Sequence, residues 1–343
     1  MNSADQSKRE IGSEFWNIPV MSKENCIFPS DTRWFISGTA ALEYIIKDIL
    51  ETNHMSSVAI PSWSCNCMIT PFIRNNVKVE FYPVYIDDHT LVCDYRGVQA
   101  DCWVLLSYFG YTTQQNVGHP SGIIIRDLTH SIFSKIENDA DYYFGSLRKW
   151  AGFYTGGYAW SKNWYLDCDL PECDPNYVNM RKRAMDQKAA YIKGVSDSKA
   201  YLSLFEECED YLDHCFPMKG YISDIEKAYY LDINKIQEQR RKNSRILLDA
   251  FSNWALFPDL QDDDCPLFVP ILIRPDKRNA LKSYLIEHDV FCPVHWPVEK
   301  EHVLDDRTKK IYQTELSIIC DQRYNEDDMK HIIEIVVASG IVV

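Results

Sequence analysis

The stretch GIIIRDLTH, residues 122–130, places three consecutive isoleucines just before an arginine and Asp127. A short apolar run without alternation is typical of a strand buried on both faces, as in a parallel sheet. Similar runs, rich in β-branched and aromatic residues, recur at 58–61, 77–84, 102–109, 141–147 and 157–160. The first half of the chain therefore predicts a central sheet.

Helical patterns lie between some of these runs. The clearest covers residues 40–50, where Leu42, Ile45, Ile46 and Ile49 recur at helical spacing. Strands that alternate with helices predict an α/β domain with a mostly parallel sheet. In such a domain, ligands bind at the carboxyl ends of the strands.

The second half of the chain has a different pattern. Long helical stretches at 177–215 and 224–251 come first, and a loop is expected at 259–266. Strand and helix patterns then alternate at 267–273, 277–288, 317–320 and 326–337. We predict a large domain over residues 1–215 and a smaller α+β domain over residues 216–343.

The composition of the 343 residues, with 46% hydrophobic and 25% charged side chains, is that of a globular protein. The net charge of −14 provides no uniform positive field for nucleic acid or an anionic membrane. No apolar stretch is long enough to span a bilayer, and residues 1–10 lack the apolar region of a secretion signal. The 12 cysteines include no CxxC pair, which argues against a structural zinc site. We expect reduced thiols, a cytoplasmic location and no metal.

The small residues Ser37, Gly38, Thr39 and Ala40 stand at the start of the helical pattern over 40–50. Small side chains let a ligand approach the backbone, and the free N–H groups and dipole of a helix N-terminus attract phosphate. The alternative is a plain helix cap by Ser37 or Thr39.

Asp127 and His130 follow the isoleucine run, at the predicted carboxyl end of a buried strand. A carboxylate that is removed from water there needs a cationic partner. Both side chains are therefore candidates for one ligand-binding crevice. The alternative is a structural pair, with Asp127 bound to a neighbouring arginine and His130 satisfied in the core.

Lys149 lies among bulky aromatic residues, just after the run at 141–147 and before the turn Gly156–Gly157. Such surroundings predict partial removal from water, which lowers the pKa of an amine and makes it a nucleophile for carbonyls. The alternative is an ordinary solvated lysine.

Together, a phosphate cradle, a buried carboxylate and an activated amine meet the needs of pyridoxal phosphate. That cofactor requires an amine for a Schiff base, a carboxylate for its ring nitrogen and an anchor for its phosphate. Neither GxGxxG nor GxxxxGK[ST] nor HExxH occurs in the chain, so other cofactors lack a motif.

Five motifs in order extend this interpretation over most of the chain. They are SGTAAL (37–42), IPSWSC (60–65), VYID (84–87), DLTHS (127–131) and SLRKWAGFYTGG (146–157). The ordered set resembles the DegT/DnrJ/EryC1/StrS aminotransferases, which act on sugars. The resemblance implies the fold type I of pyridoxal-phosphate-dependent transferases, with pyridoxal 5'-phosphate as cofactor. It also implies a homodimer whose active sites are shared between the subunits.

The resemblance implies a role for each matching residue. Lys149 resembles the lysine that forms the Schiff base and carries protons, where the family's dehydrases have histidine. Asp127 matches the acid that pairs with the pyridine nitrogen, and His130 falls near the phenolic oxygen. The phosphate-binding positions match Gly38, Thr39, Ala40 and Ser146.

Two departures affect the binding of the cofactor. Cys65 stands where the family usually has an aromatic residue that stacks on the cofactor ring. We expect Trp63 to stack there instead, with Tyr108 or Phe109 as the alternative. The usual asparagine of the partner-subunit loop is also absent, and Ser223 is the residue expected to reach the phosphate across the dimer.

The segment FCPVHWP, residues 291–297, resembles the family's segment near the substrate mouth. His295 or Trp296 is a candidate to contact the acceptor, and the alternative is a buried structural pair.

The predicted function is the transfer of an amino group from an amino acid, expected to be glutamate, to a nucleotide-linked keto sugar. Such a reaction serves the biosynthesis of amino sugars for polysaccharides or secondary metabolites. Two alternatives stay open: a lyase or dehydrase on the same fold, and a regulatory protein that keeps the cofactor without turnover.

Overall fold

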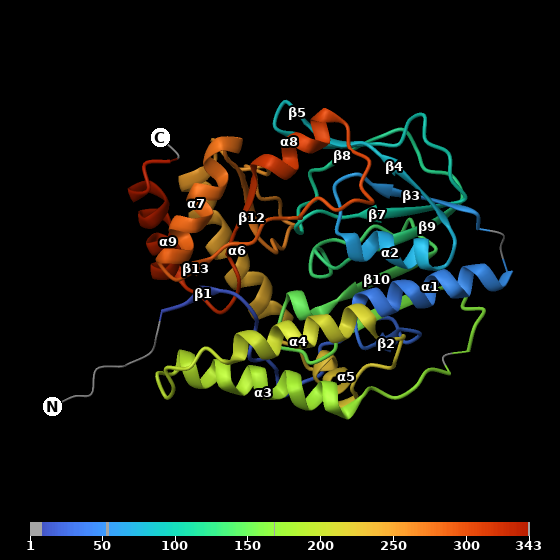
Figure 1. The fold of residues 1–343 in the computed structure, drawn as a ribbon, viewed down its shortest axis with the longest axis horizontal. Coiled ribbons are helices and arrows are strands. Elements are labelled where there is room, and N and C mark those ends of the chain that lie inside the picture. The colour runs from blue at the N-terminus through green and yellow to red at the C-terminus, as the bar shows by residue number, and fades with distance from the viewer. Residues whose placement is uncertain (1–8, 53–54, 168, 342–343) are drawn as a thin grey trace.

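The computed structural model describes residues 9–52, 55–167 and 169–341, and a seven-stranded sheet forms the centre of its larger part (Figure 1). From edge to edge the strands are β2 (Arg33–Phe35), β11 (Gly157–Ser161), β10 (Tyr142–Ser146), β9 (Ile123–Asp127), β7 (Cys102–Leu106), β3 (Ser57–Pro61) and β4 (Lys78–Tyr82). The five strands from β10 to β4 pair in parallel, whereas β11 and β2 pair antiparallel. The predicted, mostly parallel sheet is confirmed.

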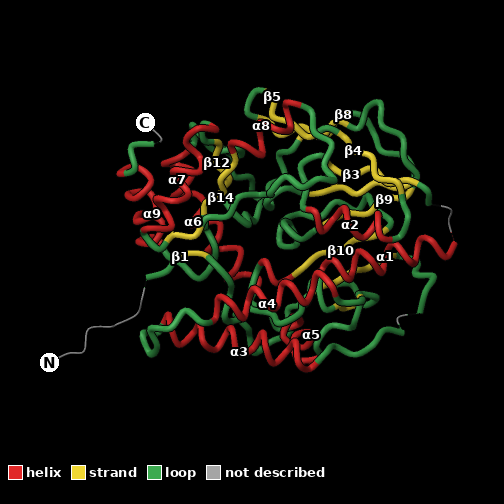
Figure 2. The backbone as a smooth tube through the Cα atoms, viewed as in Figure 1, coloured by secondary structure: helices red, strands yellow, loops and turns green. Residues whose placement is uncertain are grey.

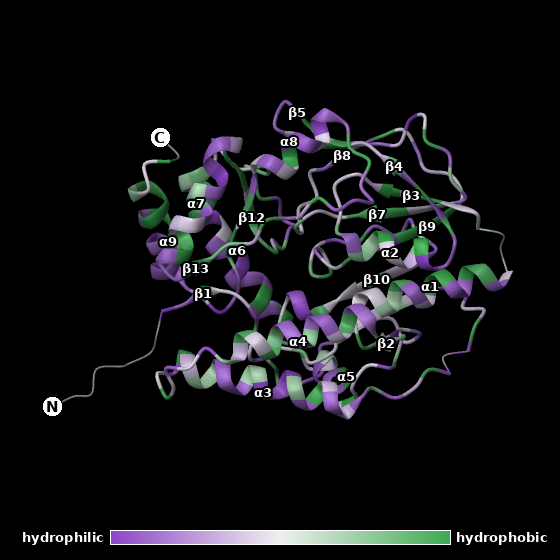
Figure 3. Cartoon of the chain, viewed as in Figure 1, coloured by the Kyte–Doolittle hydropathy of each residue, from purple (hydrophilic) through white to green (hydrophobic). Residues whose placement is uncertain are grey.

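The apolar runs form the centre of this sheet because helices and loops cover both faces. All five residues of β7 are buried, and so are four of the five in β3. Figure 3 shows these two strands as largely hydrophobic. Strands without a solvent-facing side need no polar alternation, which is why the runs were continuous in the sequence.

Helix α1 (Gly38–Thr52) packs against β10 and β11. Its buried face includes Ile45, Ile46 and Ile49, as the helical spacing predicted. Helix α2 (Asn66–Arg74) packs against α1 and β4. A separate three-stranded sheet consists of β5 (Val84–Asp87), β6 (Thr90–Asp94) and β8 (Gln115–Val117), and its strand β5 packs against helix α8 (Asp306–Thr314).

The two long helical stretches are each divided in the structure. Residues 177–215 form α3 (Pro175–Ile192) and α4 (Tyr201–His214), which pack side by side (Figure 1). Gly194, with a φ of +68°, lies in the turn between them. Residues 224–251 form α5 (Ile222–Tyr229) and α6 (Ile233–Phe251), and Asp232 between them caps α6 by accepting the Lys235 N–H. A helical pattern alone does not show these breaks.

The C-terminal part alternates strands and helices as predicted (Figure 2). Strands β12 (Val269–Leu272) and β14 (Glu315–Ile318) pair antiparallel, beside helices α6, α7 (Pro275–Glu287) and α9 (Glu326–Ala338). The short strand β13 (Val290–Phe291) pairs with β1 (Ile11–Gly12) from the start of the chain. The N-terminal arm is thereby attached to the C-terminal part, while the domain boundary near residue 215 stays a prediction.

Candidate active site

A cavity of about 310 Å³ opens where β9 and β10 end and α1 begins. This is the carboxyl edge of the parallel sheet, where ligands bind in α/β folds. The cavity brings together six of the predicted site residues: Gly38, Thr39, Asp127, His130, Ser146 and Lys149.

Asp127 is the last residue of β9, and its side chain is buried. One carboxylate oxygen, Oδ1, accepts the Thr129 N–H at 2.7 Å. The adjacent Arg126 pairs with Asp139 instead, and Asp127 has no ion pair within the described residues. Burial raises the pKa of Asp127 to about 6, while the Thr129 N–H and the Lys149 ammonium act in the opposite direction. The structural alternative, an Asp127–arginine pair, is therefore not what the chain forms.

His130 lies against the same cavity and is almost completely buried. Its ring stacks on Trp296, with centroids 5.5 Å apart and planes at 19°. Burial, with the nearby His295 and Lys149, lowers the pKa of His130 well below its ordinary value, so the imidazole is neutral. Its Nδ1 is buried without a hydrogen-bond partner in the described part of the chain. A buried nitrogen without a hydrogen bond lowers the stability of the fold, and a ligand that forms a hydrogen bond with it would remove that cost.

The N-terminus of α1 faces the cavity through Gly38 and Thr39. Ser37 Oγ accepts the Ala40 N–H at 3.1 Å, so Ser37 does cap this helix and the Ala40 N–H is already used. Ala40 is buried and does not line the cavity, in contrast to the prediction. A Cβ on Gly38 would come within 3.3 Å of Ser146 Cβ, so glycine lets the helix start close beside β10.

Lys149 ends a short 3₁₀ turn, Leu147–Lys149, that follows β10. The turn is fixed by the Leu147 N–H, which donates to Gly156 O at 2.8 Å, and by the Trp150 indole, which donates to Thr129 O at 2.9 Å. The side chain of Lys149 is exposed, not partly buried as the flanking aromatic residues suggested. Those aromatic rings pack into the core and leave the amine free to reach the cavity.

Trp63 is not in the predicted place. Its ring is fully buried, stacks on Tyr108 with centroids 4.8 Å apart, and donates from Nε1 to His295 O at 2.6 Å. Tyr108 and Phe109, the alternatives for stacking on a ring, are also fully buried. Two aromatic rings line the cavity together with the His130 imidazole: Phe144 of β10 and Trp296 from the segment 291–297. Trp63 instead supports that segment from behind.

The thiols of Cys65 and Cys67 line the cavity at the start of α2, with their sulfur atoms 2.7 Å apart. The hydrogen bond with Cys67 lowers the pKa of Cys65 and raises that of Cys67. Ser223 lies on α5 and does not line this cavity. Its predicted contact runs across a dimer, so that role stays a prediction.

Four charged residues beside Lys149 were missed by the sequence analysis. Arg181 on α3 pairs with Glu14 of the N-terminal arm at 2.6 Å and with Glu209 of α4 at 3.1 Å. Arg148 also pairs with Glu209. Although burial raises the pKa of Glu14, the charges of Arg181, Arg148 and Lys149 hold that pKa at about 2. These residues come from four segments far apart in sequence, so no local pattern could have indicated them.

The described ranges hold no cluster of three or more His, Cys, Asp or Glu side chains suited to a metal ion. Within the same residues, no helix is both long enough and apolar enough to span a membrane.

Comparisons with known proteins establish the fold. No protein-family model matches the chain, and no curated protein matches it either. Among solved structures, Spr1654 of Streptococcus pneumoniae, a provisionally assigned sugar aminotransferase in its pyridoxal phosphate form, is 14% identical, with a TM-score of 0.66 over 98% of this chain and 100% of its own. PseC of Helicobacter pylori, an aminotransferase involved in pseudoaminic acid biosynthesis, is 13% identical, with a TM-score of 0.61 over 95% and 99%. A DegT/DnrJ/EryC1/StrS aminotransferase of Brucella abortus is 14% identical, with a TM-score of 0.54 over 90% and 85%. The chain has the fold type I of pyridoxal-phosphate-dependent transferases.

Proposed function

We propose that the protein is a pyridoxal-phosphate-dependent aminotransferase of the sugar aminotransferase type. The observation that carries the proposal is the meeting of Lys149, Asp127 and His130 with the N-terminus of α1 around one cavity. Fold alone would not suffice, because one fold supports many reactions. Sugar aminotransferases among the structural neighbours support the choice of reaction.

The residues present fit the cofactor. Asp127 is buried and has no ion pair with a cationic side chain in the described residues. A protonated ring nitrogen could therefore be its partner. The unsatisfied Nδ1 of His130 is a place for a phenolic oxygen. Gly38, Thr39 and Ser146 lie where a phosphate would meet the positive end of the α1 dipole.

In the proposed mechanism, pyridoxal phosphate would supply an electron-withdrawing ring and the carbonyl that accepts the amino group. Lys149 Nζ would act first as general base and then as general acid. It would take the proton from Cα of the amino donor and return it to the carbon that receives the amino group. Asp127 would hold the proton on the ring nitrogen. The packing of Trp296 and His130 against each other would restrict water at the reacting carbon.

The proposal extends to substrates and assembly. The donor is an amino acid, expected to be glutamate, and the acceptor is a keto sugar, expected to be nucleotide-linked. The protein acts in the cytoplasm as a homodimer with shared active sites, and binds neither nucleic acid nor membrane. The net charge of −14 supports the last point.

The visible absorption spectrum tests this proposal. Purified protein is mixed with pyridoxal phosphate, and glutamate is then added. We expect a Schiff-base band that disappears with glutamate as one equivalent of 2-oxoglutarate forms. A band that glutamate does not change would point to another donor or to a lyase. Absence of any band would contradict the proposal.

A further inference from the structure

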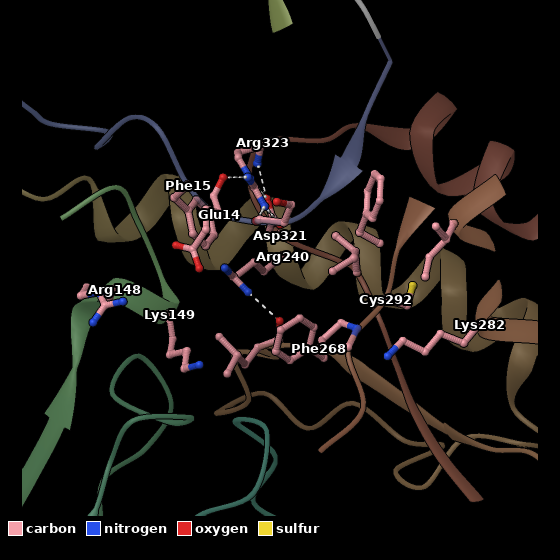
Figure 4. Close-up of a pocket in the computed structure, with 16 residues that line it drawn as sticks. Glu14, Phe15, Arg148, Lys149, Arg240, Phe268, Lys282, Cys292, Asp321 and Arg323 are labelled. Atoms are coloured by element: carbon pink, nitrogen blue, oxygen red, sulfur yellow. Dashed lines mark hydrogen bonds and ion pairs between the residues drawn. The ribbon is translucent and has the colours of Figure 1, made fainter. Parts of the chain in front are cut away.

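A second cavity, of about 400 Å³, lies on the other side of Lys149 (Figure 4). Lys149, Arg148 and Glu14 line both cavities, so Lys149 stands between them. The far side of the second cavity is built by the C-terminal part, through Arg240 of α6 and Lys282 of α7. Figure 4 shows the amines of Lys149 and Lys282 directed toward its middle from opposite sides, with Arg240 between them.

The charged side chains around the second cavity are unequal in sign. The acidic ones are Glu14 and Asp321, and the cationic ones are Arg148, Lys149, Arg240, Lys282 and Arg323. Each of these two acids already forms an ion pair with an arginine. Glu14 pairs with Arg181 at 2.6 Å, and Asp321 pairs with Arg323 at 2.8 Å. The cavity therefore has an excess of positive charge that its own carboxylates do not neutralise.

Within the described residues, Arg240 and Lys282 form no ion pair with a carboxylate, although the charge of Arg240 helps to lower the pKa of the nearby Asp321. Arg240 is fully buried, yet its hydrogen bonds go only to neutral groups: Gln322 Oε1 and the carbonyl oxygens of Pro266 and Leu267. Its guanidinium also lies over the Trp150 ring at 4.5 Å. Lys282 lines the cavity and forms no ion pair or hydrogen bond within the described residues, and its charge acts on the buried Glu315 only without such a contact. Arg240 is therefore a fully buried cation without an ion pair of its own, and a bound anion would stabilise it.

Apart from Ser13, the remaining walls of the second cavity are apolar. They include Phe15, Leu267, Phe268, Phe291 and Ile319. Apolar walls lower the local dielectric constant, so each cation attracts an anion more strongly than it would in water. They also suit a short hydrocarbon chain between two charged ends.

We propose that this second cavity is an anion subsite of the active site, in which Lys282 and Arg240 bind a negatively charged group of a substrate whose reacting carbon lies at Lys149. The inference rests on the proposed function for the role of Lys149. A carboxylate and a phosphate share the chemistry required, namely anionic oxygens that accept hydrogen bonds from an ammonium and a guanidinium. Lys282 is then the residue that selects substrates by their charge.

The test is calorimetric titration of the protein, loaded with pyridoxal phosphate, with glutarate and separately with inorganic phosphate. Glutarate has two carboxylates but neither an amine nor a ketone, so its binding does not depend on amino transfer. We compare the wild type with Lys282→Met. The matched control is Lys277→Met, because Lys277 lies on the same helix but is exposed and does not line the cavity.

We expect Lys282→Met to weaken the binding of one probe about tenfold, as the loss of one charged contact does, while Lys277→Met binds it as the wild type does. If the affinity for glutarate depends on Lys282, the subsite binds a carboxylate. If only the affinity for phosphate depends on Lys282, the subsite binds a phosphate. Equal affinities in the wild type and Lys282→Met, or no binding of either probe, would overturn the inference. Binding that depends on Lys282 in a protein that fails the glutamate test would refute the proposed function and leave the subsite standing.

Discussion

Lys149 is the side chain on which the proposed chemistry depends most directly. Lys149→Ala should lower turnover at least 1000-fold, roughly the share of general acid–base and covalent catalysis. Because the side chain is exposed, the free energy of unfolding should change by no more than about 0.5 kcal/mol. Steady-state kinetics and urea unfolding measure the two effects. Lys162→Ala, at another exposed lysine, is the control. Unchanged turnover in Lys149→Ala would end the hypothesis.

Asp127 should show opposite effects on rate and on stability. Asp127→Asn removes the partner of the ring nitrogen, so the rate should fall by orders of magnitude. In cofactor-free protein, however, the pKa of Asp127 is raised to about 6 from 3.8, because burial disfavours its charge. The native state therefore binds the proton more tightly, and stability is lost as pH rises from about 4 through 6. At pH 8, Asp127→Asn should be more stable than wild type by about 3 kcal/mol, an advantage absent at pH 4.

Urea unfolding at the two pH values measures this difference. Asp249→Asn makes the same substitution at an exposed aspartate of α6 that does not line the cavity, and serves as the control. If Asp127→Asn were no more stable than the wild type at pH 8, the carboxylate would have a cation that the structure does not show.

At the scale of elements, Arg181 connects the N-terminal arm, α3 and α4. Arg181→Met keeps much of the buried volume but removes the pairs with Glu14 and Glu209, and should lower the free energy of unfolding by about 2 kcal/mol at pH 7. The pKa of Glu14 is held at about 2, below its ordinary 4.5. The ionised Glu14 carboxylate therefore contributes fully to stability above pH 4.5. This contribution is lost as pH falls toward 2. The difference between Arg181→Met and wild type should therefore shrink in acid.

Arg183→Met is the matched control, because Arg183 lies on the same helix but is exposed. Denaturant unfolding between pH 7 and pH 3 follows both variants. A cost of Arg181→Met that stays constant over this range would mean that packing, not charge, accounts for it.

At the scale of the whole molecule, the sheet and the positions at its carboxyl edge were predictable because each depends on a local pattern. The isoleucine run predicted that Asp127 lies at the end of a buried strand, and the small residues from Ser37 predicted the start of α1. The position of Trp63 was not predictable, because its ring could pack toward the cavity or behind it. Stacking on Tyr108 and the hydrogen bond to the His295 carbonyl hold the ring behind the cavity. Both residues are distant from Trp63 in the sequence. The same holds for Lys282 and Arg240, which meet Lys149 only when the C-terminal part folds against the sheet.

The proposed homodimer has a candidate interface beside Ser223. Phe216 precedes the segment 220–223 and Ile222 lies within it, and 78% and 63% of their surfaces are exposed in the single chain. Exposed apolar side chains of this size near a predicted partner contact indicate a protein interface. The protein should therefore have twice the mass of its 40.0 kDa chain in sedimentation velocity.

Because buried charge opposes association, Ile222→Glu should shift the protein toward the single-chain mass and lower its activity together with its dimer content. Val303→Glu changes another exposed apolar residue, at 74% exposure, and should leave both properties unchanged. If the active site were complete within one chain, a monomeric Ile222→Glu protein would keep its activity. A loss of activity that follows the loss of dimer would mean that the partner subunit completes the cavity at Lys149.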